Sequence, residues 1–190
     1  MEIDNQKLLL SAVNILLQTI NEQGLEDDED LAVSLEGKEA VKVLTETKNT
    51  VLARGWDFNT DEGYKLTPDS SGFIQVPYNV LDISGVSKSI VMREWNLYDK
   101  DNQTRKFDEP VSCNIVWNAN FNDITHPIRH YITIRAARVF QARMIGDGNQ
   151  YTFTQQDEQL ALIDAKESEG RTGKYNMLES SFGINLQQRN

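Results

Sequence analysis

The chain has 190 residues, and its 29 acidic and 19 basic side chains give a formal net charge of −10. This length suffices for one well-buried domain, or for one domain with a small insert, and the acidic balance argues against a surface that grips nucleic acid. The single cysteine, Cys113, excludes an internal disulfide and fits a reducing compartment. The longest apolar run near the start, Leu8 to Leu10, is short and follows no basic region, so we expect neither a signal peptide nor a membrane span.

Two helices are predicted in the first third of the chain. Residues 5–22 place their apolar side chains on one broad arc. Residues 37–54 place theirs on a narrower stripe that ends at Gly55, a residue suited to a left-handed position after a helix. The acidic run 26–30 between them predicts a solvated loop, and the alternative is a site for a cation or a basic partner.

The helical period disappears between Trp56 and Asn120. Short pieces rich in β-branched and aromatic residues alternate there with turn signals at 68–72, 77–79 and 99–102. This pattern predicts a small antiparallel β insert, at about residues 56–120, between the second and third helices.

A helix over residues 126–146 is the element around which the rest of the chain is organised. Pro127 suits its first turn and Gly146 its C-cap, and apolar side chains lie on nearly all its sides, which predicts that it is enclosed. The helix carries four arginines and no carboxylate, so their acidic partners must come from elsewhere in the fold or from another subunit. The resulting candidates for a subunit interface are Arg135, Arg138 and Arg143.

A fourth helix is predicted over residues 155–169. Thr154 and Asp157 form a capping-box pattern at its start, Leu160 and Ile163 are expected to face inward, and Gly170 is expected to end it. We expect the polar segment 171–190 to be a flexible tail. The predicted fold is therefore α+β and mainly α, a single domain over residues 1–190, with a four-helix bundle, a small β insert and an extended C-terminal tail.

Searches for catalytic and metal-binding patterns give near-matches that fail. Asp57, Asn59 and Asp61 have calcium-loop spacing, but Glu62 stands where the loop needs glycine. A second near-match that starts at Asp99 fails in the same way. His126 and His130 have zinc-ligand spacing without a third ligand, and Cys113 lies in an alternating apolar run typical of a core position. We therefore expect no catalytic residues, no cofactor and no metal, and a protein that is not an enzyme.

Three pieces of the sequence resemble the tail tubular protein A family of short-tailed phages. The first is Arg54-Gly55-Trp56-Asp57-Phe58-Asn59 with Gly63, Leu66 and Pro68-Asp69 after it, which is similar to an RGWxFN…G…LxPD signature. The second is the helix 126–146, with Tyr131, Arg138, Phe140, Arg143 and Gly146. The third is Tyr175-Asn176-Met177-Leu178, which is similar to a (Y/F)NML element. The likeness covers roughly residues 8–180.

The resemblance implies a structural role in the virion. Members of this family form a homo-oligomeric ring of twelve adaptor subunits between the portal and a tail nozzle of the tail tubular protein B type. The ring anchors tail fibres, and the genome passes through its lumen without sequence-specific binding. It implies a location in the virion tail, after assembly in the host cytoplasm, and no membrane partner.

The resemblance also suggests roles for its motif residues. Tyr175, Asn176, Met177 and Leu178 would dock on the portal or a neighbour, with packing on their own bundle as the alternative. Trp56 and Phe58 are expected in the core where the second helix enters the β region. The alternative functions are a head-completion connector of a long-tailed phage and a tail-associated cell-wall hydrolase.

Overall fold

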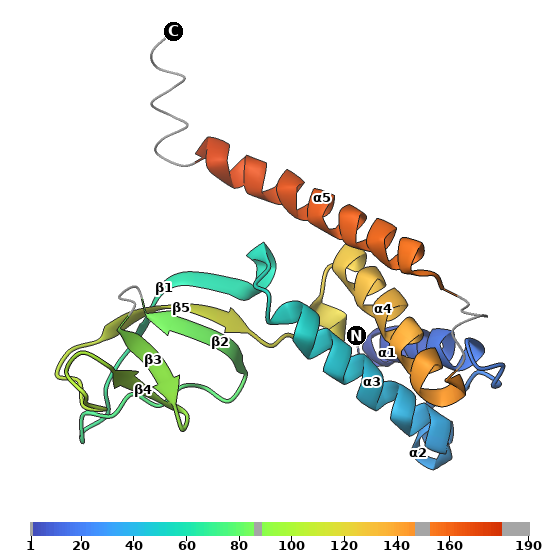
Figure 1. Ribbon diagram of the computed structural model, residues 1–190, viewed down its shortest axis with the longest axis horizontal. Helices are drawn as coiled ribbons and strands as arrows, with labels where there is room; N and C mark the ends of the chain where they lie inside the picture. Colours follow the sequence, from blue (N-terminus) through green and yellow to red (C-terminus); the bar gives the residue numbers. More distant parts are fainter. Residues whose placement is uncertain (1, 86–88, 147–152, 180–190) are drawn as a thin grey trace, which may run out of the picture. The chain divides into compact units, whose positions relative to one another are not determined.

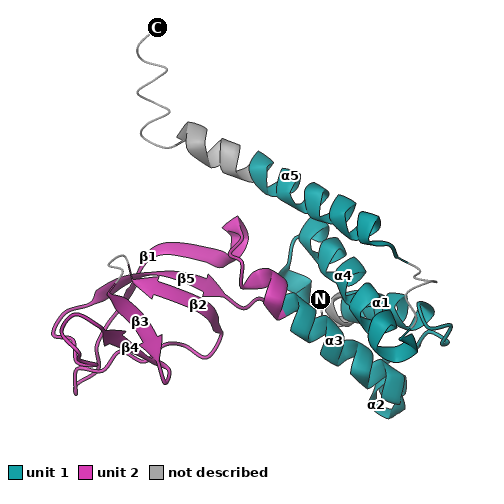
Figure 2. Cartoon of the chain, in the orientation of Figure 1, with its two compact units in different colours: residues 1–48, 120–190 teal, residues 49–119 magenta. Residues whose placement is uncertain are grey.

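The computed structural model describes residues 2–85, 89–146 and 153–179, with side chains described from residue 7 to residue 171 within those ranges (Figure 1). It divides into two compact units, one formed by residues 1–48 and 120–190 and the other by residues 49–119 (Figure 2). The helices of the described residues are α1 (Glu2–Gln18), α2 (Asp28–Val33), α3 (Leu35–Leu52), α4 (His126–Ile145) and α5 (Gln155–Glu179).

The first unit is built around α4, which packs against α1 and α5. Pro127 lies in the first turn of α4, and Gly146 caps its end with a φ of +73°. Its buried residues include neighbours that point in different directions around the helix, such as Tyr131, Ile132 and Ile134. The expectation that this helix is enclosed is therefore confirmed up to Gln141, whereas residues 142–145 of its last turn are exposed.

The second unit is a β structure in two antiparallel sheets. The strands are β1 (Thr60–Leu66), β2 (Val80–Gly85), β3 (Ile90–Arg93), β4 (Asn96–Asp99) and β5 (Val111–Trp117). One sheet has the order β1-β5-β2, and the other pairs β3 with β4. Their shared core contains Cys113, which is completely buried, so its predicted core position is confirmed. Burial also raises the pKa of the Cys113 thiol. Two 3-10 turns, Asp57–Asn59 and Phe121–Asp123, flank the strands.

The α+β class is confirmed, but the four-helix bundle with a single small β insert is wrong. The described residues form five helices and two sheets. The additional helix, α2, lies in the acidic run expected to be a loop, because the Asp27 side chain accepts the backbone N–H groups of Glu29 and Asp30, both at 2.9 Å. The second sheet is the hairpin of β3 and β4, which does not extend the three-stranded sheet and whose Asn96 forms an isolated bridge with Gln75.

Helix boundaries also differ from those expected. The first helix ends at Gln18, where the Thr19 hydroxyl bonds to the Leu16 carbonyl at 2.6 Å, and Asn21 has a φ of +59°. Helix α5 continues through Gly170 and Gly173 to Glu179, since each glycine inside a helix costs only about 1 kcal/mol relative to alanine. The rest of the expected tail, residues 180–190, lies outside the described residues.

Candidate interaction surfaces

The motif around Arg54 to Asn59 forms a corner between α3 and β1. Asn59 is only 3% exposed, and its amide Nδ2 donates to the carbonyls of Leu52 at 3.2 Å and Trp117 at 2.7 Å. Its Oδ1 accepts the backbone N–H of Trp56 at 2.8 Å. One buried amide therefore joins the end of α3, the 3-10 turn and the end of β5.

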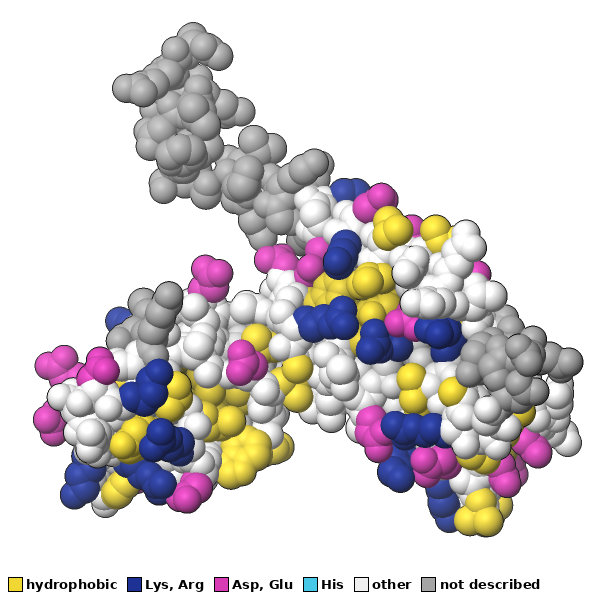
Figure 3. All heavy atoms as spheres, viewed as in Figure 1, with side chains coloured by type: hydrophobic (Ala, Val, Ile, Leu, Met, Phe, Trp, Pro, Cys, Tyr) yellow, Lys and Arg dark blue, Asp and Glu magenta, His cyan; other side chains and the backbone are white. Residues whose placement is uncertain are grey.

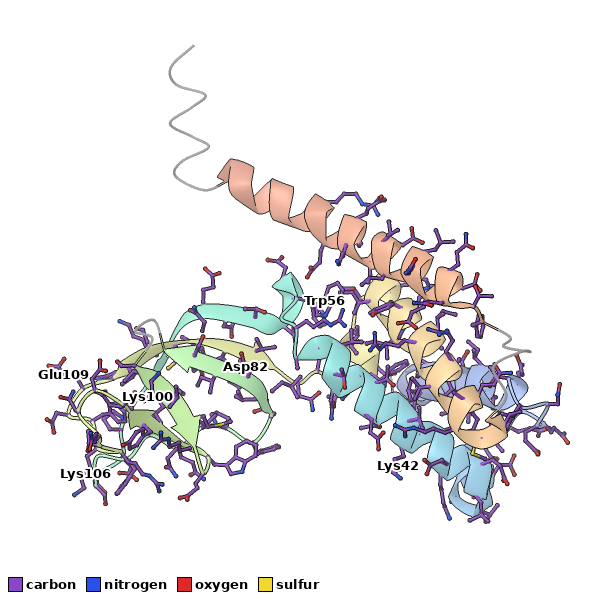
Figure 4. The ribbon with its side chains drawn as sticks, in the orientation of Figure 1. Lys42, Trp56, Asp82, Lys100, Lys106 and Glu109 are labelled. Atoms are coloured by element: carbon purple, nitrogen blue, oxygen red, sulfur yellow. The ribbon has the colours of Figure 1, made fainter. Side chains whose placement is uncertain are left out.

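The aromatic residues of this corner differ in exposure. Trp56 lies just beyond the C-terminal end of α3 (Figure 4), is 5% exposed, and donates from Nε1 to the Val51 carbonyl at 2.9 Å. Gly55 has a φ of +74°, and a Cβ there would lie 3.2 Å from the Thr60 hydroxyl oxygen. Phe58 is 36% exposed, so its expected core position is wrong, and Arg54 is also exposed.

The remaining residues of the motif shape turns within the second unit. Gly63 has a φ of +69° at the bulge where β1 shifts register against β5, and its N–H donates to Asn114 Oδ1 at 3.1 Å. Asp69 Oδ1 accepts the N–H groups of Ser71 at 2.8 Å and Phe73 at 3.0 Å. These residues contribute to function by setting the fold of the β unit.

Two candidate interface arginines share one carboxylate within the chain. Glu158 of α5 accepts from Arg135 at 3.1 Å and also pairs with Arg138, while Arg135 donates to the Tyr131 hydroxyl at 3.1 Å. The side chain of Glu158 is 16% exposed, and those of Arg135 and Arg138 are 29% and 25% exposed. Two cations and one anion leave this cluster at +1, and the buried Nε of Arg138 has no hydrogen-bond partner within the described residues.

The third candidate interface arginine, Arg143, is more exposed to solvent than Arg135 and Arg138. It pairs with Glu46 of α3 at 2.9 Å, and both side chains are 46% exposed, so its expected place within the buried stripe is wrong. The first-turn arginine, Arg129, donates to the carbonyls of Ile124 at 3.0 Å and Asn122 at 3.4 Å.

Sequence reasoning missed Glu158 and assigned the wrong face of α5. Ala161 and Ala165 are the buried residues of its described part, whereas Leu160 and Ile163 are 54% and 50% exposed. The spacing of Glu158, Ala161 and Ala165 places them on one face, and that is the signal that would have identified this carboxylate. The backbone of Tyr175 to Leu178 is helical, and their side chains lie outside the described residues.

The near-matches to metal sites do not gather ligands. Within the side chains that the structure describes, no three His, Cys, Asp or Glu residues lie close enough together to hold a metal ion. The exposed rings of His126 and His130 stack with their centroids 6.4 Å apart. Asp99 caps the turn that follows β4, where hydrogen bonds from Asn102 and Asp101 lower its pKa. No helix of the described residues has the length and apolar character needed to cross a membrane.

Comparison with known proteins identifies the family. A family model described as tail tubular protein matches residues 10–175 of the chain. The chain belongs to the tail tubular protein family. Tail tubular protein A of Klebsiella phage KP34 is 30% identical over 161 residues, which cover 83% of this chain and 85% of that protein. The chain is accordingly a structural protein of a phage tail, and the expected resemblance to the tail tubular protein family is confirmed.

Proposed function

We propose that this tail tubular protein is an adaptor subunit that forms a ring of twelve copies between the portal and the tail nozzle of a phage. The ring also anchors tail fibres and lets the genome pass during ejection. Each subunit folds in the host cytoplasm and is then incorporated into the virion tail. Its role is structural, and it carries no catalytic activity.

Uncovered apolar side chains on α4 and α5 support this proposal. Leu160 and Ile163 of α5 are 54% and 50% exposed, and Met144 and Ile145 at the end of α4 are 42% and 49% exposed. Exposed apolar side chains that lie one turn apart on a helix, as Leu160 and Ile163 do, are often found where a protein contacts another protein. A ring provides such a contact on each subunit, since its interfaces join two different patches of the same chain.

The proposed interface also includes the arginine cluster of α4. The group of Arg135, Arg138 and Glu158 carries a charge of +1, and the Nε of Arg138 lacks a partner within the described residues. A carboxylate from a neighbouring subunit would neutralise that charge. We propose the same kind of role, docking on the portal or a neighbour, for Tyr175, Asn176, Met177 and Leu178.

The proposal is tested by sedimentation of the purified chain alone and after mixing with the purified portal protein. The chain alone should sediment as a monomer or weak oligomer, and the mixture should contain portal-bound rings visible by electron microscopy. An unchanged monomer at high concentration in both samples would contradict the adaptor role. Zymography on cell-wall substrate should show no clearing, and a cleared zone would favour a hydrolase.

A further inference from the structure

The corner between α2 and α3 presents two apolar side chains to solvent. Val33 and Leu35 are 78% and 76% exposed, and they flank Ser34, whose hydroxyl accepts the Gly37 N–H at 2.9 Å. Helix α2 has no buried residue. Burial of its side chains in a core therefore does not explain why this helix forms. A Cβ on Gly37 would lie 2.9 Å from a Leu25 methyl group, so the corner is closely packed behind these two residues.

Acidic residues surround this corner in the sequence. Residues 22–39 contain eight acidic side chains and one lysine, which gives this stretch a formal charge of −7. Among the described residues, its ion pairing consists of Glu39 with Lys42 at 3.5 Å, and that pair is exposed. We call Val33, Leu35 and these carboxylates the acidic knob. Its chemistry fits a partner with an apolar hollow beside positive charge.

The second unit contains a hollow with that chemistry. It has a volume of about 470 Å³ and is lined by Gln75, Val76, Pro77, Tyr78 and Trp95. Tyr78 is 92% exposed and Trp95 is 50% exposed, and aromatic side chains of this kind often anchor protein interfaces. We call these five residues the aromatic hollow.

The turn that carries Trp95 is fixed in an unfavourable backbone conformation. Glu94 and Trp95 have φ values of +51° and +61°, a region that non-glycine residues rarely occupy and that costs of order 1 kcal/mol or more each. The Trp95 carbonyl accepts the Val76 N–H at 2.8 Å, and Glu94 pairs with Arg105 at 2.8 Å. These contacts fix the backbone that carries the indole before any partner binds, which lowers the entropy cost of binding.

The charges beside the hollow are opposite in sign to those of the knob. Arg93, Glu94 and the Arg105 that pairs with Glu94 together carry a charge of +1. The Arg93 guanidinium lies 4.0 Å from the centre of the Tyr98 ring. Figure 3 shows Lys and Arg side chains beside apolar ones on the face of the second unit that it displays. The hollow is lined by uncharged residues, as a seat for the side chains of Val33 and Leu35 requires.

We propose that the acidic knob of one copy binds the aromatic hollow of the next copy. The contact joins two different patches of the same chain, and contacts of this kind build a ring when the rotation between neighbouring copies closes. This inference rests on the proposed ring and adds the residues that would form one contact between its subunits. The carboxylates of the knob would lie beside Arg93 and Arg105 of the neighbour, which makes association weaker at high salt.

Cysteine cross-linking tests the contact directly. The buried Cys113 is the chain's single native cysteine, so it gives little background reaction. In portal-bound rings of a chain carrying both Val33→Cys and Tyr78→Cys, oxidation should produce a ladder of linked subunits on a non-reducing gel. Either single variant should give no ladder, and a mixture of the two single variants should give dimers. Cross-links that stay within one chain, or that join the knob to the portal, would overturn the proposal.

Substitutions separate this contact from ring formation as such. Val33→Asp with Leu35→Asp should weaken subunit association by at least roughly tenfold, because the hollow then receives carboxylates in place of methyl groups. The melting temperature of the isolated chain should not change, since both residues are exposed. Normal rings from this variant would overturn the knob contact and leave the adaptor role intact. Failure of the wild-type chain to form rings on the portal would overturn both.

Discussion

At the scale of single residues, Asn59 is the residue of the family motif whose buried side chain connects three segments of the fold. Replacing it with aspartate keeps its size and its bond to the Trp56 N–H, but turns a donor into an anion facing the carbonyls of Leu52 and Trp117. We expect Asn59→Asp to destabilise the protein by about 3 kcal/mol, because a buried charge would face two acceptors. Thermal unfolding monitored by circular dichroism measures this loss.

Asn114 supplies a matched control for that experiment. It accepts the Gly63 N–H through Oδ1 and is exposed, so Asn114→Asp preserves the bond that matters. Its effect should stay within about 0.5 kcal/mol. Equal destabilisation by the two substitutions would show that the buried amide of Asn59 has no special role.

At the scale of elements, one carboxylate supplies the ion pairs between α5 and α4. Glu158→Gln keeps the shape of the side chain but leaves Arg135 and Arg138 half-buried without an anion. The expected cost is about 2 kcal/mol, below the 3–5 kcal/mol typical of a fully buried pair because water reaches this cluster. Hydrogen exchange should show faster opening of α5 than of α1.

The pair of Arg143 and Glu46 provides the comparison. Both side chains are 46% exposed, so Glu46→Gln should cost about 0–1 kcal/mol. A similar acceleration of exchange in α5 by both substitutions would contradict the role given to Glu158.

A second prediction at this scale concerns the end of α5. A chain truncated after Gly170 keeps Glu158, Ala161 and Ala165, the described residues that attach this helix to α4. It should therefore fold with nearly unchanged melting, yet bind the portal more weakly, because it lacks Tyr175 to Leu178. Co-sedimentation with the portal measures this binding. If the truncated chain binds the portal as strongly as the full-length chain does, Tyr175 to Leu178 are not docking residues.

Local sequence determined some elements and not others. The helix 126–146 was predictable because proline, glycine and apolar residues occupy the positions that a helix requires. Helix α2 was missed because a capping bond from Asp27 outweighs the repulsion within an acidic run. The separation into two sheets was also missed, since the pairing of Gln75 with Asn96 depends on contacts distant in sequence.

For the candidate interaction surfaces, the sequence predicted the types of residue involved but not which residues pair with each other. The arginines of α4 indicated that carboxylates must lie nearby, but the sequence left open whether these came from the same chain. The structure supplies Glu158 and Glu46 from α5 and α3. The sequence did not predict that Leu160 is exposed. The helix packs against α4 through the small side chains of Ala161 and Ala165, which lie on another face of α5 and allow the two helices to approach closely.

At the scale of the whole molecule, the charge of −10 bears on the proposed passage of a genome through the ring. Affinity for DNA depends on lysines and arginines that neutralise phosphates. Two such residues of α4, Arg135 and Arg138, are already paired with a carboxylate. We therefore expect neither the free chain nor its rings to retain duplex DNA at physiological salt in a filter-binding assay. Retention there would contradict a lumen that lets DNA slide.

The bulge at Gly63 has a consequence for the aggregation of the free chain. Strand β1 is an edge of its sheet, and unpaired edges recruit further strands into aggregates. Here the register shift between Asp61 and Tyr64, with the charged residues Asp61, Glu62 and Lys65, interrupts the regular ladder that a foreign strand would need. The edge of β1 is therefore a poor template for a foreign strand, and we expect the free chain to resist fibril formation even at high concentration.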